Sequence, residues 1–242
     1  QAGQAVAASF GQASLFADEN GEDERIVNWT KAERWDDRKL YTLERDAFGF
    51  CLTGDMFDPY RVEARNFAIP FKDVRDSREQ QTIAGIVQSV RTITGKRGNF
   101  GVVVLSDGQT TMDVLVFSRA YESYKHMLKA DEMLIFTGKG RKDERSGGMS
   151  FVCDEVLTIE QMRVRRGATL ILEIAEGSSL ESLSKVLNEG QHNDVGGVAC
   201  EVSIKRNGVK AELELKNRYL PTDHFLNSIK CNEHITFARF AY

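Results

Sequence analysis

The chain has no long apolar run, and its charges nearly balance. None of its 242 residues belong to a stretch like the roughly 20 apolar residues that a membrane-spanning helix needs. No basic start followed by an apolar run and a small-residue cleavage site marks a secretory signal. The formal net charge of -4 argues against bulk coating of nucleic acid, although one local basic groove remains compatible with it. We expect a soluble, cytoplasmic protein with no membrane partner.

Cysteine pairs are also missing from the sequence. Cys51, Cys153, Cys200 and Cys231 are scattered, without the spacing of a metal site or of a disulfide framework. Each is expected to be a reduced thiol that serves as a small core residue. The sequence therefore predicts no metal site and no cofactor.

The patterns of an active site are absent as well. Two-metal nucleotidyl transfer needs clustered carboxylates, but the acids here fall in helix caps, turns and an acidic N-terminal segment. The histidines lie in separate segments and form no HExxH pattern: His126, His192, His224 and His234. Gly138-Lys139-Gly140 lacks the spaced glycines and the Ser or Thr of a phosphate-binding loop. We predict no catalytic residue in this chain.

What is present indicates several domains. The length allows more than one core. Residues 1–24 are rich in Ala, Gln, Gly and acids, a composition that favours solvation, and we expect a flexible tether there. The chain opens on Gln1 with no initiator Met, so we expect a fragment of a longer protein.

Residues 25–79 are expected to form a helical connector. Apolar residues recur at helical spacing after the possible caps Asp36-Asp37, namely Leu40, Leu43, Ala47, Phe48 and Cys51. Gly54 is expected to end this helix. A second helix is predicted to begin where Asp58 serves as N-cap before Pro59, and to run towards Phe67.

The residue pattern of 80–161 is typical of a β-barrel. Alternating strands are expected over 82–91, 100–105 and 110–117, then a helix over 119–128, then strands over 132–141 and 149–157. Three strands, a helix and two strands is the order of a five-stranded OB-fold, although other small barrels share five strands.

Residues 162–242 are expected to form a second small domain. Strands are predicted over 169–174, 196–204, 210–215 and 235–240, with helices over 179–187 and 222–229. This β-α-β-β-α-β order predicts a two-layer module, and it makes the whole chain a multidomain α+β protein.

The segment Gln12-Ala13-Ser14-Leu15-Phe16 resembles a bacterial sliding-clamp binding motif. The glutamine amide can donate and accept hydrogen bonds, and two adjacent apolar side chains can fill a pocket. Each apolar side chain would contribute roughly 1.5 to 3 kcal/mol before ordering costs, so micromolar affinity is expected. We predict clamp contacts by Gln12, Ser14, Leu15 and Phe16. The alternative is a hydrophobic staple that packs on the chain's own domain.

The expected barrel carries candidate nucleic-acid contacts, because cations can bind phosphates and aromatic rings can stack on bases. The candidates are Arg91, Lys96, Arg97, Phe100, Phe117, Lys139, Arg141, Lys142 and Arg145. The alternative is a solvated charged surface with both phenylalanines in the core. Asp143 and Glu144 interrupt the second basic cluster, so any DNA binding should be weak.

The second domain contains candidate contact residues but no candidate catalytic group. Its candidate contacts combine Arg with aromatic rings, the types enriched at interface anchors: Arg218, Tyr219, Arg239 and Tyr242. The neighbouring apolar residues are equally suited to the core, and Tyr242 is the best candidate for an exposed contact.

Taken together, the segments resemble the C-terminal region of the alpha subunit of bacterial DNA polymerase III. The residues that carry the resemblance are the pentapeptide and the segments 43–54, 84–87, 94–98 and 143–148. In that family this region comprises a clamp-binding peptide, an OB domain implicated in single-stranded DNA, and a domain that holds the tau subunit of the clamp loader. The resemblance therefore implies tau contacts for the second domain, and a parent DNA-directed DNA polymerase with its catalytic domains upstream.

The sequence differs from the family at two places, and two other functions are compatible with it. Asp55-Met56 stand where the family usually has His-Pro, which puts any role of that loop in doubt. The strand before Phe100 is one residue short, which leaves the direction of that ring open. The rivals are a tRNA-synthetase-type anticodon-binding OB domain, which would explain neither the pentapeptide nor the tail, and a free-standing single-stranded DNA binder.

Overall fold

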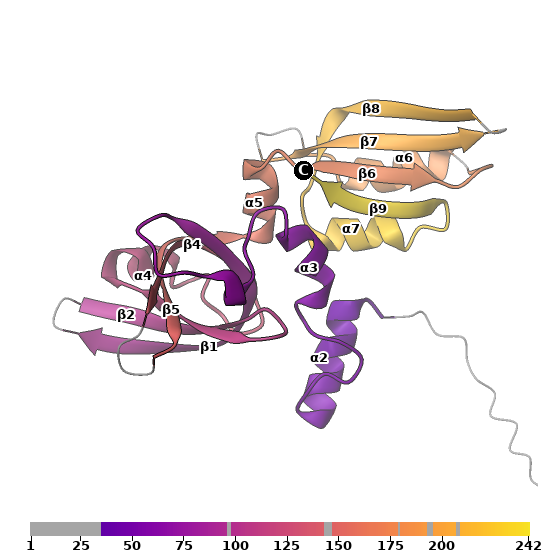
Figure 1. Ribbon diagram of the computed structural model, residues 1–242. Helices are drawn as coiled ribbons and strands as arrows, with labels where there is room; N and C mark the ends of the chain where they lie inside the picture. Colours follow the sequence, from indigo (N-terminus) through magenta and orange to yellow (C-terminus); the bar gives the residue numbers. More distant parts are fainter. Residues whose placement is uncertain (1–34, 96–97, 143–146, 179, 193–195, 207–208) are drawn as a thin grey trace, which may run out of the picture. The chain divides into compact units, whose positions relative to one another are not determined.

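A computed structural model describes residues 35–95, 98–142, 147–178, 180–192, 196–206 and 209–242 (Figure 1). By its contacts the chain divides into residues 1–34 and 35–242. The predicted tether and the clamp-binding residues Gln12, Ser14, Leu15 and Phe16 lie outside the described residues, so both stay predictions.

The first described helix, α2 (Asp37–Phe48), begins where the sequence predicts and ends earlier. The Asp36 carboxylate accepts a hydrogen bond from the Lys39 N–H at 2.8 Å, which caps the helix. Gly49 then adopts a left-handed conformation with φ +81°, which glycine takes without a Cβ clash. The predicted end at Gly54 is therefore wrong.

The apolar spacing also predicted the wrong buried side of α2. Tyr41 and Glu44 are buried, while Leu43 and Phe48 are exposed. The Glu44 carboxylate accepts hydrogen bonds from the Thr53 N–H at 3.1 Å, the Thr53 hydroxyl and the Leu52 N–H. These bonds, the one from the Thr53 N–H foremost, lower the pKa of Glu44. A carboxylate that holds the following loop cannot be recognised from apolar periodicity.

The second connector helix is α3 (Asp58–Ala64), followed by the short 3₁₀ helix η1 (Phe71–Asp73). Asp58 is the first residue of α3 rather than its N-cap, and the cap position is Phe57, which makes no side-chain capping bond. The Asp58 carboxylate instead accepts from the Asp55 N–H at 2.7 Å. Asp55, which stands where the family usually has histidine, therefore helps to hold the loop before α3.

The next strands form the predicted five-stranded barrel. They are β1 (Gln81–Gly95), β2 (Gly98–Ser106), β3 (Thr111–Val116), β4 (Met133–Lys142) and β5 (Met149–Thr158), with α4 (Ser118–Tyr124) between β3 and β4. The barrel closes in the order β1-β2-β3-β5-β4, and β3 and β5 pair in parallel. Its interior is filled by fully buried apolar side chains, among them Ile83, Val103, Leu105, Val114, Phe136 and Phe151.

The connector covers one part of the outside of this barrel. Ala84, Ile86 and Ile135 point outwards from β1 and β4 and share a buried cluster with connector residues such as Tyr60 and Phe67. Beyond Val87 the residues of β1 become mostly exposed. The first half of β1 is therefore sealed by the connector, and its second half presents an open outer face together with β2 and β3.

A helix that the sequence reasoning missed, α5 (Ile159–Arg165), follows β5 directly. Thr158 and Gln161 form a reciprocal capping box at its start, with the Gln161 N–H donating to the Thr158 hydroxyl at 3.3 Å. The Thr-x-x-Gln spacing is a known start signal and could have revealed the helix. The domain boundary predicted between residues 161 and 162 falls inside α5.

The last part of the chain confirms the predicted β-α-β-β-α-β module. Its elements are β6 (Thr169–Ile174), α6 (Leu180–Glu189), β7 (Val198–Arg206), β8 (Val209–Tyr219), α7 (Asp223–Lys230) and β9 (Ile235–Ala241). The sheet order is β8-β7-β6-β9, with β6 and β7 parallel (Figure 1). Apolar residues of α6, α7 and the sheet make one core, as alternating strands and amphipathic helices require.

A buried arginine on α5 ties these parts of the chain together. Arg163 is 1% exposed, and its guanidinium binds both carboxylate oxygens of Glu63 on α3 at 2.7 Å. Its Nη1 lies 2.8 Å from the Asp223 carboxylate of α7 and donates to the Pro221 carbonyl at 2.7 Å. The guanidinium also lies 4.2 Å from the centre of the Phe240 ring. One side chain thus satisfies groups from three separate segments.

Two tyrosines complete this network. Tyr60 donates its hydroxyl hydrogen to Asp223 at 2.6 Å, and Tyr242 donates to Glu63 at 2.6 Å. Burial, reinforced by the neighbouring carboxylates, raises the pKa of both hydroxyls, so both stay protonated donors. Burial by itself would lower the pKa of Arg163, but Glu63 and Asp223 outweigh it and raise that pKa. Arg163 therefore keeps its charge, and both tyrosines keep their hydroxyl hydrogens, at physiological pH.

Candidate nucleic-acid interface

The strand register turns most of the described candidate contacts to the outer surface of the barrel. Directly paired residues of neighbouring strands point to the same side of a sheet. One row of such pairs crosses all the barrel strands, in the order Arg91, Val102, Leu115, Val152 and Lys139. An apolar strip thus runs around the outer surface over β2, β3 and β5, with a cation at each end.

A second row places the two predicted aromatic residues side by side. Phe100 pairs with Ile93, and Phe117 directly follows the residue that pairs with Gly101. The ring centres of Phe100 and Phe117 lie 5.7 Å apart, and the ring planes meet at 37°. Phe117 is 45% exposed and Phe100 is half-buried. The direction of Phe100, left open by the sequence, is therefore outwards, and neither ring lies in the barrel core.

A third row adds one more cation. Val104 pairs with Asp113, Asp113 with Ser150, and Ser150 with Arg141. Lys142 is exposed, but it follows Arg141 in the strand and therefore points to the other side. Lys96, Arg97 and Arg145 lie outside the described residues. The structure thus turns Arg91, Phe100, Phe117, Lys139 and Arg141 to the outer surface of the barrel, places the two rings side by side, and separates Lys142 from them.

Acidic residues on the same face limit its positive charge. Asp113 lies in the same row of paired residues as Arg141, and Asp154 follows the residue that pairs with Val116. Both carboxylates are exposed. Because they offset part of the charge of the cations, the face favours contacts through stacking and apolar surface over contacts through charge.

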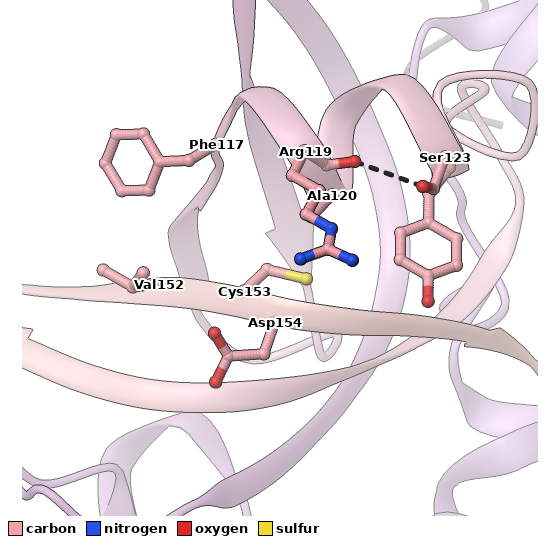
Figure 2. A pocket seen from close by; sticks show the side chains of 8 residues that line it. Phe117, Arg119, Ala120, Ser123, Val152, Cys153 and Asp154 are labelled. Carbon is pink, nitrogen blue, oxygen red and sulfur yellow. Dashed lines mark hydrogen bonds between the residues drawn. The ribbon is translucent and has the colours of Figure 1, made fainter. Parts of the chain in front are cut away.

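A shallow groove of about 370 Å³ adjoins this face between α4 and β5 (Figure 2). Its walls are formed by Phe117, Val152, Tyr124 and Ala120, and its polar groups include Arg119 and Asp154. Cys153 lies beneath it, and burial raises the pKa of this thiol to about 12, so it stays neutral. The sequence reasoning missed Arg119 and Asp154, although strand alternation beyond Val152 could have placed Asp154 outwards.

The predicted contact residues of the last domain differ in exposure. Tyr219 is 3% exposed and its ring stacks on Phe225 within the core, so it presents no ring surface to a partner. Arg218 is exposed and donates to the Gly197 carbonyl at 2.9 Å. Tyr242 is 43% exposed, but its hydroxyl is engaged by Glu63.

Arg239 is exposed and lies beside an exposed aromatic ring. Its guanidinium lies 5.5 Å from the ring centre of Phe237, which is 42% exposed. Both side chains line a groove of about 230 Å³ on the sheet. Of the predicted contacts in this domain, Arg239 has the surroundings most typical of an interface anchor.

The barrel defines the class of protein. Residues 81–159 match a family model described as tRNA_anti-codon, an OB-fold nucleic acid binding domain. The closed five-stranded barrel with a helix between its third and fourth strands has the architecture of that fold.

Comparison with curated proteins identifies the relatives of the whole chain. DNA polymerase III subunit alpha of Escherichia coli O157:H7 is 26% identical over 235 residues, which are 93% of this chain and 20% of that protein. The same subunit of Pasteurella multocida is 30% identical over 175 residues, 70% of this chain and 15% of that protein. The predicted resemblance is thereby confirmed: the chain is homologous to part of the DNA polymerase III alpha subunit and fits its C-terminal region. It spans about a fifth of the length of these relatives.

Among solved structures, the chain is similar to RecG bound to a three-way DNA junction. The two are 25% identical over 36% of this chain and 12% of that chain, with a TM-score of 0.31. A likeness at that score carries no argument about function.

The described residues contain neither a candidate metal site nor a helix suited to span a membrane. Within residues 35–242, apart from the gaps named above, no three His, Cys, Asp or Glu side chains are grouped so that they could hold a metal ion. In the same residues no helix combines the length and apolar character of a membrane span. The absence of catalytic residues stays a prediction.

Proposed function

We propose that this chain is a targeting region of a replicative DNA polymerase alpha subunit in the cytoplasm. Its barrel binds single-stranded DNA weakly, its N-terminal peptide binds the sliding clamp, and its last domain binds the tau subunit of the clamp loader. Homology to DNA polymerase III alpha over most of the chain supports this proposal. DNA polymerisation itself would be an activity of the longer protein.

A single observation carries the DNA-binding part of the proposal. The outer surface of the barrel combines the half-buried Phe100 and the exposed Phe117 with an apolar strip and with a cation at each end of that strip. Stacking suits single strands, because an unpaired base of any type offers a ring face, whereas the bases of a duplex are already stacked. The face therefore supports binding of single-stranded nucleic acid without strong sequence preference.

Loss of both rings is expected to weaken binding of single-stranded DNA. Phe100→Ala with Phe117→Ala should raise the dissociation constant for an oligothymidylate strand at least ten-fold, since stacking contributes roughly 1 to 3 kcal/mol per base. Contacts by Arg91, Lys139 and Arg141 predict that log affinity falls with log salt at a slope of about -2.1, or -0.7 per contact. Fluorescence anisotropy at several salt concentrations measures both quantities.

A buried ring provides the control. Phe71 of η1 is 4% exposed and packs in the barrel core, so the conservative change Phe71→Leu should leave the dissociation constant for the oligothymidylate unchanged. Unchanged affinity in the Phe100 and Phe117 double variant, or affinity independent of salt, would remove this face from the proposal.

The tau-type contact is proposed on Arg239, supported by Arg218 and Tyr242. Phe237→Ala with Arg239→Ala removes an exposed ring and the cation above it, and we expect at least a ten-fold loss of affinity for tau. Lys216→Ala removes an exposed cation from β8, the opposite edge strand, and serves as the control. Surface plasmon resonance with immobilised tau measures the effect, and equal affinity of both variants would contradict the assignment.

The anticodon-binding alternative is favoured by one observation, the name of the matching family model. The same barrel face would then stack on unpaired RNA bases. Titration with an oligouridylate of equal length separates the two functions. Binding of RNA at least ten-fold tighter than DNA would support the alternative, whereas equal or weaker binding of RNA would support the replication role.

A further inference from the structure

The groove between α4 and β5 continues the outer face of the barrel. Phe117 and Val152 belong both to the face and to the lining of the groove. Both Arg119 of α4 and Asp154 of β5 line the groove, and Figure 2 shows the Arg119 side chain extending towards β5 and the Asp154 carboxylate on the other side of that strand in this view. A strand that stacks on Phe117 would therefore pass the mouth of this groove.

The lining of the groove suits one flat, mostly apolar group with polar edges. Phe117, Tyr124 and Val152 supply apolar surface, and the Cys153 thiol beneath them is neutral. Within the part of the chain that the structure describes, neither Arg119 nor Asp154 takes part in an ion pair. Both side chains are therefore available to a ligand, the carboxylate as an acceptor and the guanidinium as a donor.

We propose that this groove holds a single unpaired base of the bound strand and that Asp154 makes it prefer guanine. This inference rests on the proposed DNA binding. An ionised carboxylate only accepts hydrogen bonds. Guanine presents two adjacent N–H donors on its pairing edge, which match the two carboxylate oxygens as a bidentate pair.

The other bases fit this acceptor less well. Thymine has a single N–H between two carbonyl oxygens, and these oxygens face the carboxylate with like partial charge. Cytosine and adenine each offer an amino group beside a ring nitrogen that is itself an acceptor. Arg119, on α4, can bind the adjoining phosphate, which would hold the base over Asp154.

The test compares two strands on the full chain of 242 residues. One is an oligothymidylate, and the other carries one guanine at its centre. Fluorescence anisotropy should show roughly five-fold tighter binding of the guanine strand, the low end of what a bidentate base contact contributes. Asp154→Ala should abolish this preference while binding of the oligothymidylate persists.

Asp113→Ala is the matched control, since it removes an equal charge from the same outer face outside the groove. Both variants should bind the oligothymidylate somewhat more tightly, but only the Asp154 variant should lose the guanine preference. Equal binding of the two strands by the unchanged protein would overturn the inference and leave DNA binding intact. A chain that binds neither strand would overturn the proposed function, and the inference with it.

Discussion

The Arg163→Met variant is expected to lose about 3 to 5 kcal/mol of unfolding free energy, the usual cost of removing one partner from a buried ion pair. Methionine fills a similar volume, but it leaves the carboxylates of Glu63 and Asp223 partly buried and without a counter-charge. The Pro221 carbonyl loses its donor as well. Urea denaturation followed by circular dichroism measures the change.

The same helix contains a matched control. Arg165 also binds both carboxylate oxygens of a glutamate, Glu155, at 2.6 Å, but half of its side chain is exposed. Arg165→Met should therefore cost no more than about 1 kcal/mol, as exposed pairs do. Equal losses for the two variants would show that burial of Arg163 has no special weight.

Loss of clamp binding is the second large effect that we expect. Leu15→Ala with Phe16→Ala removes both apolar side chains of the pentapeptide, each worth roughly 1.5 to 3 kcal/mol when buried in a pocket. The combined loss corresponds to a dissociation constant at least a hundred-fold higher, which takes a micromolar interaction beyond detection. Isothermal titration calorimetry with purified clamp measures it, and Gln12→Ala should give a smaller loss.

Phe10→Ala is the control for this experiment, because Phe10 lies in the same segment but outside the pentapeptide. Its affinity for the clamp should equal that of the unchanged chain. If the Leu15 and Phe16 variant still binds, the clamp contact does not depend on this motif.

The strands and most helices could be predicted because each depends on local pattern. Alternation of apolar residues in Ile83 to Arg91 and the Asp107-Gly108 turn indicate barrel strands without further information. The end of α2 could not be placed, because both Gly49 and Gly54 can stop a helix and only Gly49 has a positive φ. The missed helix α5 shows the opposite case, since its capping box was present and was overlooked.

The candidate site could be predicted only in part. Residue type singled out Arg91, Phe100 and Phe117, since cations and rings are the groups that nucleic acid needs. Their position on the outer surface depends on strand register, which pairs residues far apart in the chain. Lys142 and Tyr219 show that residue type alone does not identify a contact. Both are suitable types, but Lys142 points away from the other cations and Tyr219 is buried.

By itself, the sequence determined the order of the elements, the class of both folded modules and the family, because these depend on local periodicity and on the order and spacing of motifs along the chain. The tertiary structure decided which side chains meet. The pairing of Phe100 with Phe117, the groove beside Asp154 and the burial of Arg163 between Glu63 and Asp223 all join residues from separate segments. Local sequence pattern cannot specify such contacts, because they form only when strands close into a barrel and helices pack against it.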